Sequence, residues 1–365
     1  MLDISQLVDI SRSESLEGAK ALHAEAYNSD DMMAIEREAI FKSSWQYVGH
    51  VSQLPDIGSV IATEIAEIPL VIVRNDDGIQ CFANVCRHRA GPLISENGKV
   101  HNLRCQYHGW TYDLAGQLIV APEMADSFRA CDVHLMSYAC KVWQGYIFVY
   151  LGDEASELNT IFQGIVEHIK PIDLSAMSFH HRDSYMVQCN WKVYMDNYLE
   201  GYHLPYVHPG LSKLLDYRSY DTTLFDWYSY QSSPLQGGDN FYGEGEAHYY
   251  CVYPNLMLNI LPGRCQVNII TPVTHDQCRV DFDYFYADQE SDETNRLISQ
   301  DLDFSDEIQQ EDIDICEKVQ KGLQSGTYSA GYLCQKREKG VWHFQELIRA
   351  AYRSWLSRQN YPLTD

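Results

Sequence analysis

Two short motifs in the first third of the chain each combine one cysteine with one histidine. Residues 86–89 read Cys-Arg-His-Arg and residues 105–110 read Cys-Gln-Tyr-His-Gly-Trp, with sixteen residues between the first histidine and the second cysteine. Thiolate and imidazole ligands suit zinc or an iron–sulfur cluster. Two hairpin-tip loops that each give one sulfur and one nitrogen can place both cysteines on one iron and both histidines on the other, which is the ligation of a Rieske [2Fe–2S] centre. The pattern indicates that Cys86, His88, Cys105 and His108 bind such a cluster.

A Cys2His2 zinc site is the alternative for the same four residues. Zinc fingers usually group their cysteines on one arm and their histidines on the other, whereas each motif here carries one of each. The mixed arrangement favours the iron–sulfur cluster. His101 lies between the motifs but outside both, and we interpret it as a loop residue.

A second group of metal-binding residue types lies in the second half of the chain. A helix that begins at Asn190 should end near Gly201 and Pro205, because both residues disfavour helix continuation. His203 and His208 then lie at the end of that helix, where two imidazoles can converge on one ion. Two histidines five residues apart are weak support by themselves, because unrelated polar residues often show that spacing.

The third ligand follows from helical periodicity. An apolar stripe runs along a predicted helix over residues 298–323 and consists of Ile298, Leu302, Ile308, Ile315, Val319 and Leu323. Asp312 falls on this stripe, four residues after Ile308 and three before Ile315. A carboxylate on a buried face is costly unless it is paired or binds a metal. Two histidines and one carboxylate with open positions form the facial triad of non-haem Fe(II) oxygenases.

The elements that must position these residues fall into three segments. Residues 1–44 read as helical, residues 45–152 as short strands with tight turns, and residues 153–365 as mixed helices and antiparallel strands. We expect a helical stretch over residues 159–168, strands over 178–188, 248–257, 267–271 and 278–286, a loop over 231–245, and long helices over 293–323 and 342–356. The fold class is therefore α+β, with a small all-β domain followed by a larger domain that contains an antiparallel sheet.

Composition excludes several classes of partner. The chain has 365 residues, with 27 Lys and Arg against 51 Asp and Glu, so its formal net charge is −24. Such an acidic surface repels nucleic acid and anionic membranes. Eleven scattered cysteines fit a reducing compartment better than a disulfide framework. Because no signal peptide and no membrane-spanning run is evident, we expect a cytoplasmic protein.

Both motif sets resemble those of the Rieske non-haem iron oxygenases, also called the ring-hydroxylating oxygenase α-subunit family. C-x-H-R followed by C-x-Y-H-G-W-x-Y is similar to the family's Rieske domain, and N-W-K followed by the two histidines is similar to its catalytic domain. The segment Asp312-x4-Glu317-x2-Gln320 resembles the family's distal ligand motif. The resemblance implies a helix-grip catalytic domain with mononuclear Fe(II), a homotrimer, O2 as co-substrate and a separate NAD(P)H-dependent flavin and iron–sulfur reductase. No dinucleotide fingerprint is evident in the chain itself.

Glu200 takes its expected role from the same resemblance. It stands three residues before His203, where the family usually has an aspartate that links the cluster of one subunit to the iron of the next. A glutamate at this position resembles enzymes related to carnitine monooxygenase. Other stretches, such as 88–92 and 253–255, are similar to the choline-oxidising members.

The resemblance favours hydroxylation or N-demethylation of a small quaternary ammonium compound. Aromatic faces bind such cations. The candidates for a cage, for each of which packing within the sheet is the favoured interpretation, are Trp227, Tyr228, Tyr230, Tyr249 and Tyr250. The alternative is an aromatic ring-hydroxylating dioxygenase, which an aromatic pocket suits equally well. A pure Rieske electron carrier is a third reading, but it leaves His203, His208 and Asp312 without a use.

Overall fold

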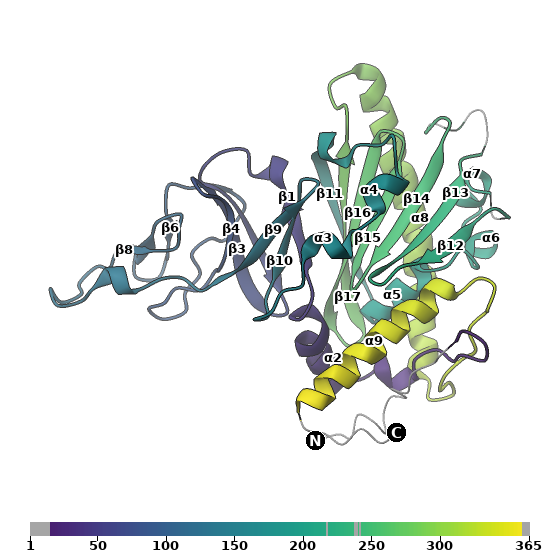
Figure 1. The fold of residues 1–365 in the computed structure, drawn as a ribbon, viewed down its shortest axis with the longest axis horizontal. Helices are drawn as coiled ribbons and strands as arrows, with labels where there is room; N and C mark the ends of the chain where they lie inside the picture. The colour runs from purple at the N-terminus through teal and green to yellow at the C-terminus, as the bar shows by residue number, and fades with distance from the viewer. Residues whose placement is uncertain (1–14, 217, 237–239, 241, 360–365) are drawn as a thin grey trace. The chain divides into compact units, whose positions relative to one another are not determined.

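The structure, a computed structural model, describes residues 15–216, 218–236, 240 and 242–359. The chain divides into two compact units (Figure 1). One unit comprises Phe41–Leu158, and the other comprises the described residues up to Ile40 together with those from Asn159 onward. Among the described residues, no helix is long and apolar enough to cross a bilayer.

The smaller unit is built from antiparallel strands. Seven of them form a sheet in the order β1-β10-β9-β4-β3-β2-β5, and three short strands form a second sheet, β6-β7-β8. Their bounds are β1 Gln46–His50, β2 Ser59–Ile65, β3 Ile68–Asn75, β4 Gly78–Ala83, β5 Gly98–Lys99, β6 Leu103–Arg104, β7 Thr111–Tyr112, β8 Leu118–Val120, β9 Ser137–Trp143 and β10 Tyr146–Tyr150. One apolar cluster of this unit packs around Cys86, Cys105, Trp110 and Tyr112. The two predicted cysteine ligands are therefore part of a hydrophobic core.

The larger unit centres on one seven-stranded antiparallel sheet in the order β11-β17-β16-β15-β14-β13-β12. Its strands are β11 Ser178–Val187, β12 Asp221–Leu224, β13 Tyr228–Pro234, β14 Glu246–Val252, β15 Leu256–Leu261, β16 Arg264–Thr274 and β17 Gln277–Tyr286. The helices are α2 Asp30–Glu36, α3 Leu158–Ile161, α4 Ile165–His168, α5 Trp191–Tyr198, α6 Leu204–Val207, α7 Leu211–Leu214, α8 Asp292–Gln324 and α9 Lys339–Arg358. Figure 1 shows α5, α8 and α9 beside this sheet. Hydrogen bonds from β16 and β17 to residues of α8 attach the helix to the sheet.

Helix ends follow local chemistry. The Asn190 side chain accepts a hydrogen bond from the Lys192 amide at 2.9 Å and so caps α5, as a helix N-cap should. Ser291 caps α8 in the same way, through the Thr294 amide at 3.1 Å. The α5 helix ends at Tyr198, just before Gly201, so His203 and His208 lie outside it as the sequence predicted. The α+β fold class is confirmed by both units.

Three local predictions were wrong. Residues 15–23 are not helical: Lys20 forms a β-bridge with Tyr332, and this extended segment buries Leu22 through contacts distant in sequence. The predicted helix over 159–168 is two short helices, because Gly164 between them has φ +91°. The predicted loop over 231–245 begins too early, since β13 continues to Pro234. Residues 1–14 of the predicted N-terminal helix lie outside the described residues.

Candidate active site

The four predicted cluster ligands lie on two neighbouring loops. Cys86 and His88 follow β4, and Cys105 and His108 lie between β6 and β7. Both cysteines are buried and both histidines are exposed, and the ring centroids of His88 and His108 are 4.7 Å apart. The loops therefore bring sulfur ligands together on the inner side and imidazoles on the outer side, which fits a cluster with two differently ligated irons.

Surrounding residues hold these loops in shape. The His88 ring stacks on Trp110 at a centroid distance of 4.9 Å, and the Tyr112 hydroxyl lies 3.4 Å from the Cys86 sulfur. Gly91 passes so close to the second loop that a Cβ there would lie 2.9 Å from the Cys105 sulfur. A larger residue at position 91 would therefore clash with the Cys105 side chain.

His203, His208 and Asp312 converge on one point of the larger unit. One ligand atom from each residue lies within 4.8 Å of the others. His203 precedes α6, His208 follows it, and Asp312 comes from the middle of α8. The Nε2 atom of His208 lies 3.0 Å from Oδ1 of Asp312. Two nitrogens and one carboxylate oxygen fit a mononuclear metal with open positions.

Each member of this triad has a second partner that fixes its orientation. Nδ1 of His203 lies 2.7 Å from Oε1 of Glu200, and Nδ1 of His208 lies 2.7 Å from Oε2 of Glu311. The Asn197 amide donates to Oδ1 of Asp312 at 2.6 Å. Carboxylates that hold one imidazole nitrogen leave Nε2 of each histidine available to a metal. Sequence reasoning missed the roles of Asn197 and Glu311; the helical position of Glu311, next to Asp312, was the signal available.

A cavity of about 110 Å³ adjoins the triad. Seven aromatic residues line it, namely Tyr194, Tyr198, Tyr220, Tyr242, Tyr249, Phe282 and Phe304. Burial raises the pKa of Tyr249 to about 12, and burial also holds the pKa of Tyr198 and Tyr220 well above the ordinary value. These phenols therefore stay neutral at physiological pH, and the cavity presents their ring faces and hydroxyls without a phenolate charge.

Of the five candidate cage residues, Tyr249 lines this cavity and the other four do not. Side chains alternate between the two faces of a strand, so Tyr250 points away from Tyr249 and packs against Tyr228 and Tyr230 on the opposite face. The Tyr228 hydroxyl donates to the Gln163 carbonyl there, at 2.7 Å.

A second, larger cavity of about 610 Å³ lies on the other side of Glu200 and His203. Its lining includes Asp196, Glu338 and the apolar residues Ile315, Val319 and Leu323 of α8. The C-terminal half of the predicted apolar stripe thus faces an open space, and Val319 is 45% exposed. Asn197, Glu200 and His203 line both cavities, so the two cavities adjoin at these residues.

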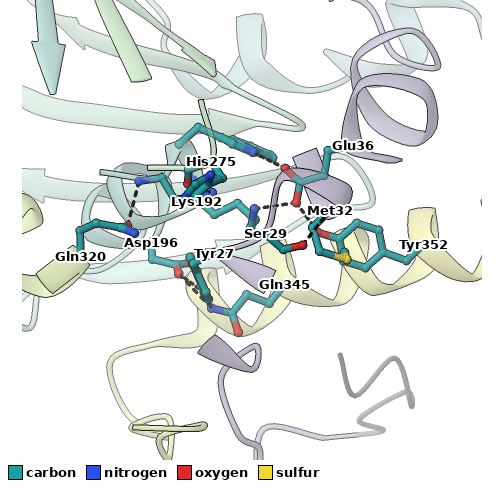
Figure 2. Close-up of polar contacts among 12 residues, drawn as sticks. Tyr27, Ser29, Met32, Glu36, Lys192, Asp196, His275, Gln320, Gln345 and Tyr352 are labelled. Atoms are coloured by element: carbon teal, nitrogen blue, oxygen red, sulfur yellow. Dashed lines mark hydrogen bonds and ion pairs between the residues drawn. The ribbon is translucent and has the colours of Figure 1, made fainter. Parts of the chain in front are cut away.

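A buried ion pair supports the helix that precedes the triad. Figure 2 shows Glu36 of α2 facing Lys192 of α5 and Tyr352 of α9. Lys192 Nζ lies 2.6 Å from Glu36 Oε1, the Trp191 indole donates to Glu36 Oε2 at 2.7 Å, and both charged side chains are almost fully buried. Removing one partner of such a pair leaves an uncompensated buried charge.

Lys192→Met is therefore expected to lower the free energy of unfolding by about 3–5 kcal/mol, the usual cost of breaking a buried pair from one side. The double change Lys192→Met with Glu36→Gln should recover part of this loss, because no charge is then left unpaired. Urea unfolding of the two variants and the wild type measures both effects. A Lys192→Met protein with the wild-type midpoint would show that the pair is not important for stability.

Asp196 lies one turn after Lys192 and faces the large cavity. Its carboxylate accepts a hydrogen bond from the Tyr27 hydroxyl at 2.7 Å and from the Gln345 amide at 3.1 Å (Figure 2). Burial raises the pKa of Asp196 to about 7, and the hydrogen bonds and the nearby Lys192 charge offset only part of that rise. Between pH 4 and pH 7 the folded protein therefore keeps a proton that the unfolded chain has lost.

That proton makes folding stability fall as pH rises from 4 to 7. Asp196→Asn should remove this part of the pH dependence. Between pH 4 and pH 7.5 the free energy of unfolding of the variant should therefore rise by about 1–2 kcal/mol relative to that of the wild type. This gain is smaller than the pKa shift alone would give, because the cavity admits solvent. Urea unfolding at both pH values gives the difference, with the exposed Asp303→Asn as control. A constant difference between the Asp196→Asn and wild-type proteins at both pH values would contradict the prediction.

Two metal-ligand sets, one in an all-β unit and one between a helix and an antiparallel sheet, define the class of protein. Residues 44–141 match the Rieske [2Fe-2S] domain, and residues 174–354 match the ring hydroxylating alpha subunit (catalytic domain). The chain belongs to the Rieske non-haem iron oxygenases, so it is an oxidoreductase that carries a [2Fe–2S] cluster and uses mononuclear iron.

Individual relatives show which members of the family the chain resembles. Choline monooxygenase of Arabidopsis thaliana is 33% identical over 95% of this chain and 86% of its own length. The carnitine monooxygenase oxygenase subunit of Escherichia coli K12 is 28% identical over 92% of this chain and 94% of its own length. The crystal structure of the quaternary ammonium Rieske monooxygenase CntA with L-carnitine superposes with a TM-score of 0.82 at 26% identity, over 92% of this chain and 96% of that one. The predicted resemblance to this family is confirmed.

Proposed function

We propose that the protein is the terminal component of an oxygenase system that hydroxylates or N-demethylates a small quaternary ammonium compound. O2 is the co-substrate, and a separate NAD(P)H-dependent flavin and iron–sulfur reductase supplies electrons. Relatives named for choline and carnitine support the substrate class. The observation that carries the proposal is the cavity of seven aromatic rings that adjoins the triad.

Each site residue has a role in this proposal. Cys86, His88, Cys105 and His108 hold the Rieske cluster, and His203, His208 and Asp312 hold mononuclear Fe(II). When bound, the cluster would supply single electrons and the mononuclear iron would supply the site of oxygen activation. Glu200 and Glu311 hold the two histidines in one tautomer and orientation. Glu200 is also the electron-transfer bridge between subunits of a homotrimer, a role that the resemblance to the family implies and that its contact with His203 supports.

Neutral tyrosine and phenylalanine rings suit an onium group. A quaternary ammonium ion cannot donate a hydrogen bond, so ring faces and carboxylates are the groups that attract it.

A turnover screen tests the proposal. Purified protein supplied with an NADH-dependent reductase should consume O2 and NADH with trimethylammonium compounds, and mass spectrometry should find a hydroxylated or demethylated product. Simple aromatics such as benzoate and toluene serve as the comparison set. Product from the aromatics and none from any ammonium compound would replace the proposed function with the ring-hydroxylating alternative.

A further inference from the structure

Three cysteines that have no part in the proposed function lie together in the larger unit. Cys189 precedes α5, Cys278 lies near the start of β17, and Cys316 lies on α8 one turn after Asp312. Each is at most 1% exposed, and none is in a disulfide. The sulfurs of Cys189 and Cys278 are 4.0 Å apart, and the Cys316 thiol donates a hydrogen bond to the Cys189 sulfur. Cys189 is therefore the centre of a buried cluster of three thiols.

Two side chains of α8 hold the backbone on both sides of Cys189. The Gln188 amide N–H donates to Glu317 Oε1 at 3.1 Å, and the Asn190 amide N–H donates to Gln320 Oε1 at 3.0 Å. Glu317 and Gln320 are the last two residues of the distal motif that the sequence shows on this helix. In the structure they fix the position of Cys189 against the helix that carries the third thiol.

The hairpin that carries Cys278 is attached to the same segment. Asn190 Nδ2 donates to the carbonyl oxygen of His275 at 2.7 Å, and His275 lies in the turn between β16 and β17. Cys278 is the second residue of β17, so this bond limits how far the two sulfurs can separate. An S–S bond is about 2.05 Å long, so the sulfurs of Cys189 and Cys278 need to approach by about 2 Å to form one.

Cys189 is the member of the cluster that is best suited to attack. Hydrogen bonds from the Cys278 and Cys316 thiols lower the pKa of Cys189, and they outweigh the opposing effects of burial and of the nearby Glu317 charge. The same hydrogen bonds, together with burial, raise the pKa of Cys278 and of Cys316 well above the ordinary value. The thiolate and not the thiol is the nucleophile, so Cys189 reacts while its neighbours keep their protons.

The position of the cluster limits the class of oxidant. Cys316 belongs to the lining of the large cavity, so the cluster lies directly behind the wall of that cavity. Burial of all three sulfurs keeps them away from glutathione disulfide and from protein disulfides, which are too large to reach them. Hydrogen peroxide is small enough, and it oxidises thiolates. It is also the two-electron reduction product of O2, which a protein of an oxygenase family encounters when O2 is reduced without product formation.

We propose that Cys189 and Cys278 form a reversible oxidation site for hydrogen peroxide, in which Cys189 is the attacking thiol. First the Cys189 sulfur bonds to one peroxide oxygen as the O–O bond breaks, and the other oxygen leaves as water with the thiol proton. The Cys278 sulfur then forms the S–S bond as the S–O bond breaks, and its proton leaves with the hydroxyl group as a second water. Two thiols thus lose two electrons and two protons to one peroxide, and a small dithiol reverses the change.

A second pair of cysteines provides the comparison within the same chain. Cys81 of β4 and Cys140 of β9 lie in the smaller unit. Burial raises the pKa of Cys81 well above the ordinary value and that of Cys140 to about 12. Because no donor stabilises a thiolate there, this pair should stay reduced at a peroxide concentration that oxidises Cys189.

Thiol mapping of the peroxide-treated holoprotein tests the proposal. Peroxide is added in small molar excess until the exposed Cys131 is oxidised, and the remaining thiols are alkylated after denaturation. Peptide mass spectrometry should find a cross-link between Cys189 and Cys278 that dithiothreitol removes. The cross-link should form at least about tenfold faster than any oxidation of Cys81 or Cys140. A parallel sample with zinc in place of the mononuclear iron should give the same cross-link, because the reaction needs only the two thiols and peroxide.

Two variants test the separate roles of the three sulfurs. In Cys189→Ala the thiols of Cys278 and Cys316 should survive the same treatment, because neither is the attacking thiol. In Cys316→Ala the cross-link should still form but several-fold more slowly, because one hydrogen bond to the Cys189 sulfur is missing. Cys81→Ala, which removes a buried thiol of the smaller unit, is the matched control and should leave the rate unchanged.

The wild-type result is decisive even where a variant does not fold. If Cys189 and Cys278 remain thiols after Cys131 has been oxidised, the oxidation site does not exist. A cross-link from Cys189 to Cys316 in wild type would overturn the assigned pair. Oxidation of Cys278 at the wild-type rate in the Cys189→Ala protein would overturn the assignment of Cys189 as the attacking thiol.

Discussion

Asp312→Ala is expected to stop oxygenation while the visible spectrum of the Rieske cluster stays as in wild type. Asp312 is the single carboxylate of the triad, and its oxygen lies 3.0 Å from His208 Nε2. Loss of a residue that merely orients a ligand costs about 10–100-fold in metal affinity or activity, so loss of the ligand itself should exceed a hundredfold in turnover. The cluster ligands belong to the other unit of the fold and should be unaffected.

Asp314→Ala is the matched control for this prediction. Asp314 lies two residues further along α8, is exposed and pairs with Lys318 one turn away. Its removal should leave iron content and turnover unchanged. Full mononuclear iron and normal turnover in Asp312→Ala would mean that another acid completes the site.

Glu200→Gln is expected to slow electron delivery by orders of magnitude while both metal sites stay filled. Oε1 of Glu200 holds Nδ1 of His203 at 2.7 Å, and Oε2 accepts from the backbone amides of Tyr202 and His203. Glutamine keeps the size and the oxygen acceptor but removes the negative charge that can hold two imidazole N–H groups at once. To measure this step, chemically reduced protein is mixed with O2 and substrate. The rate at which the absorbance of the oxidised cluster returns, and the amount of product formed per chain, report electron delivery to the mononuclear iron.

Glu311→Gln provides the comparison, because Glu311 holds His208 as Glu200 holds His203. Glu311 does not line the large cavity. Glu311→Gln should weaken binding of the mononuclear iron by about 10–100-fold. Once that iron site is refilled, the cluster should be reoxidised at the wild-type rate. A wild-type rate in the Glu200→Gln protein would remove Glu200 from the electron route.

Residues close in sequence were the easiest to predict. The two cysteine–histidine loops and the end of α5 before His203 depend on local turns and on Asn190, Gly201 and Pro205, which act within a few residues. Asp312 could be found because helical periodicity is regular over the length of α8. These local signals are sufficient to identify the candidate metal ligands without information on tertiary contacts.

Long-range register explains what could not be predicted. Tyr249 faces the cavity and Tyr250 does not, and only the pairing of β13 with β14 and the placement of α8 decide which face is inward. Arg264 forms an ion pair with Asp301, which is 37 positions further along the chain and lies on α8. The Glu36–Lys192 pair likewise joins residues 156 positions apart.

Metal analysis of the purified protein tests the central claim most directly, because the account requires two different iron sites on one chain. Iron and zinc are measured per chain after anaerobic reconstitution with iron and sulfide, alongside acid-labile sulfide. The account predicts about three irons and two sulfides per chain in a red-brown protein, two irons from the cluster and one from the triad. A colourless protein with zinc in place of the cluster, or one with two irons and none at the triad, would contradict it.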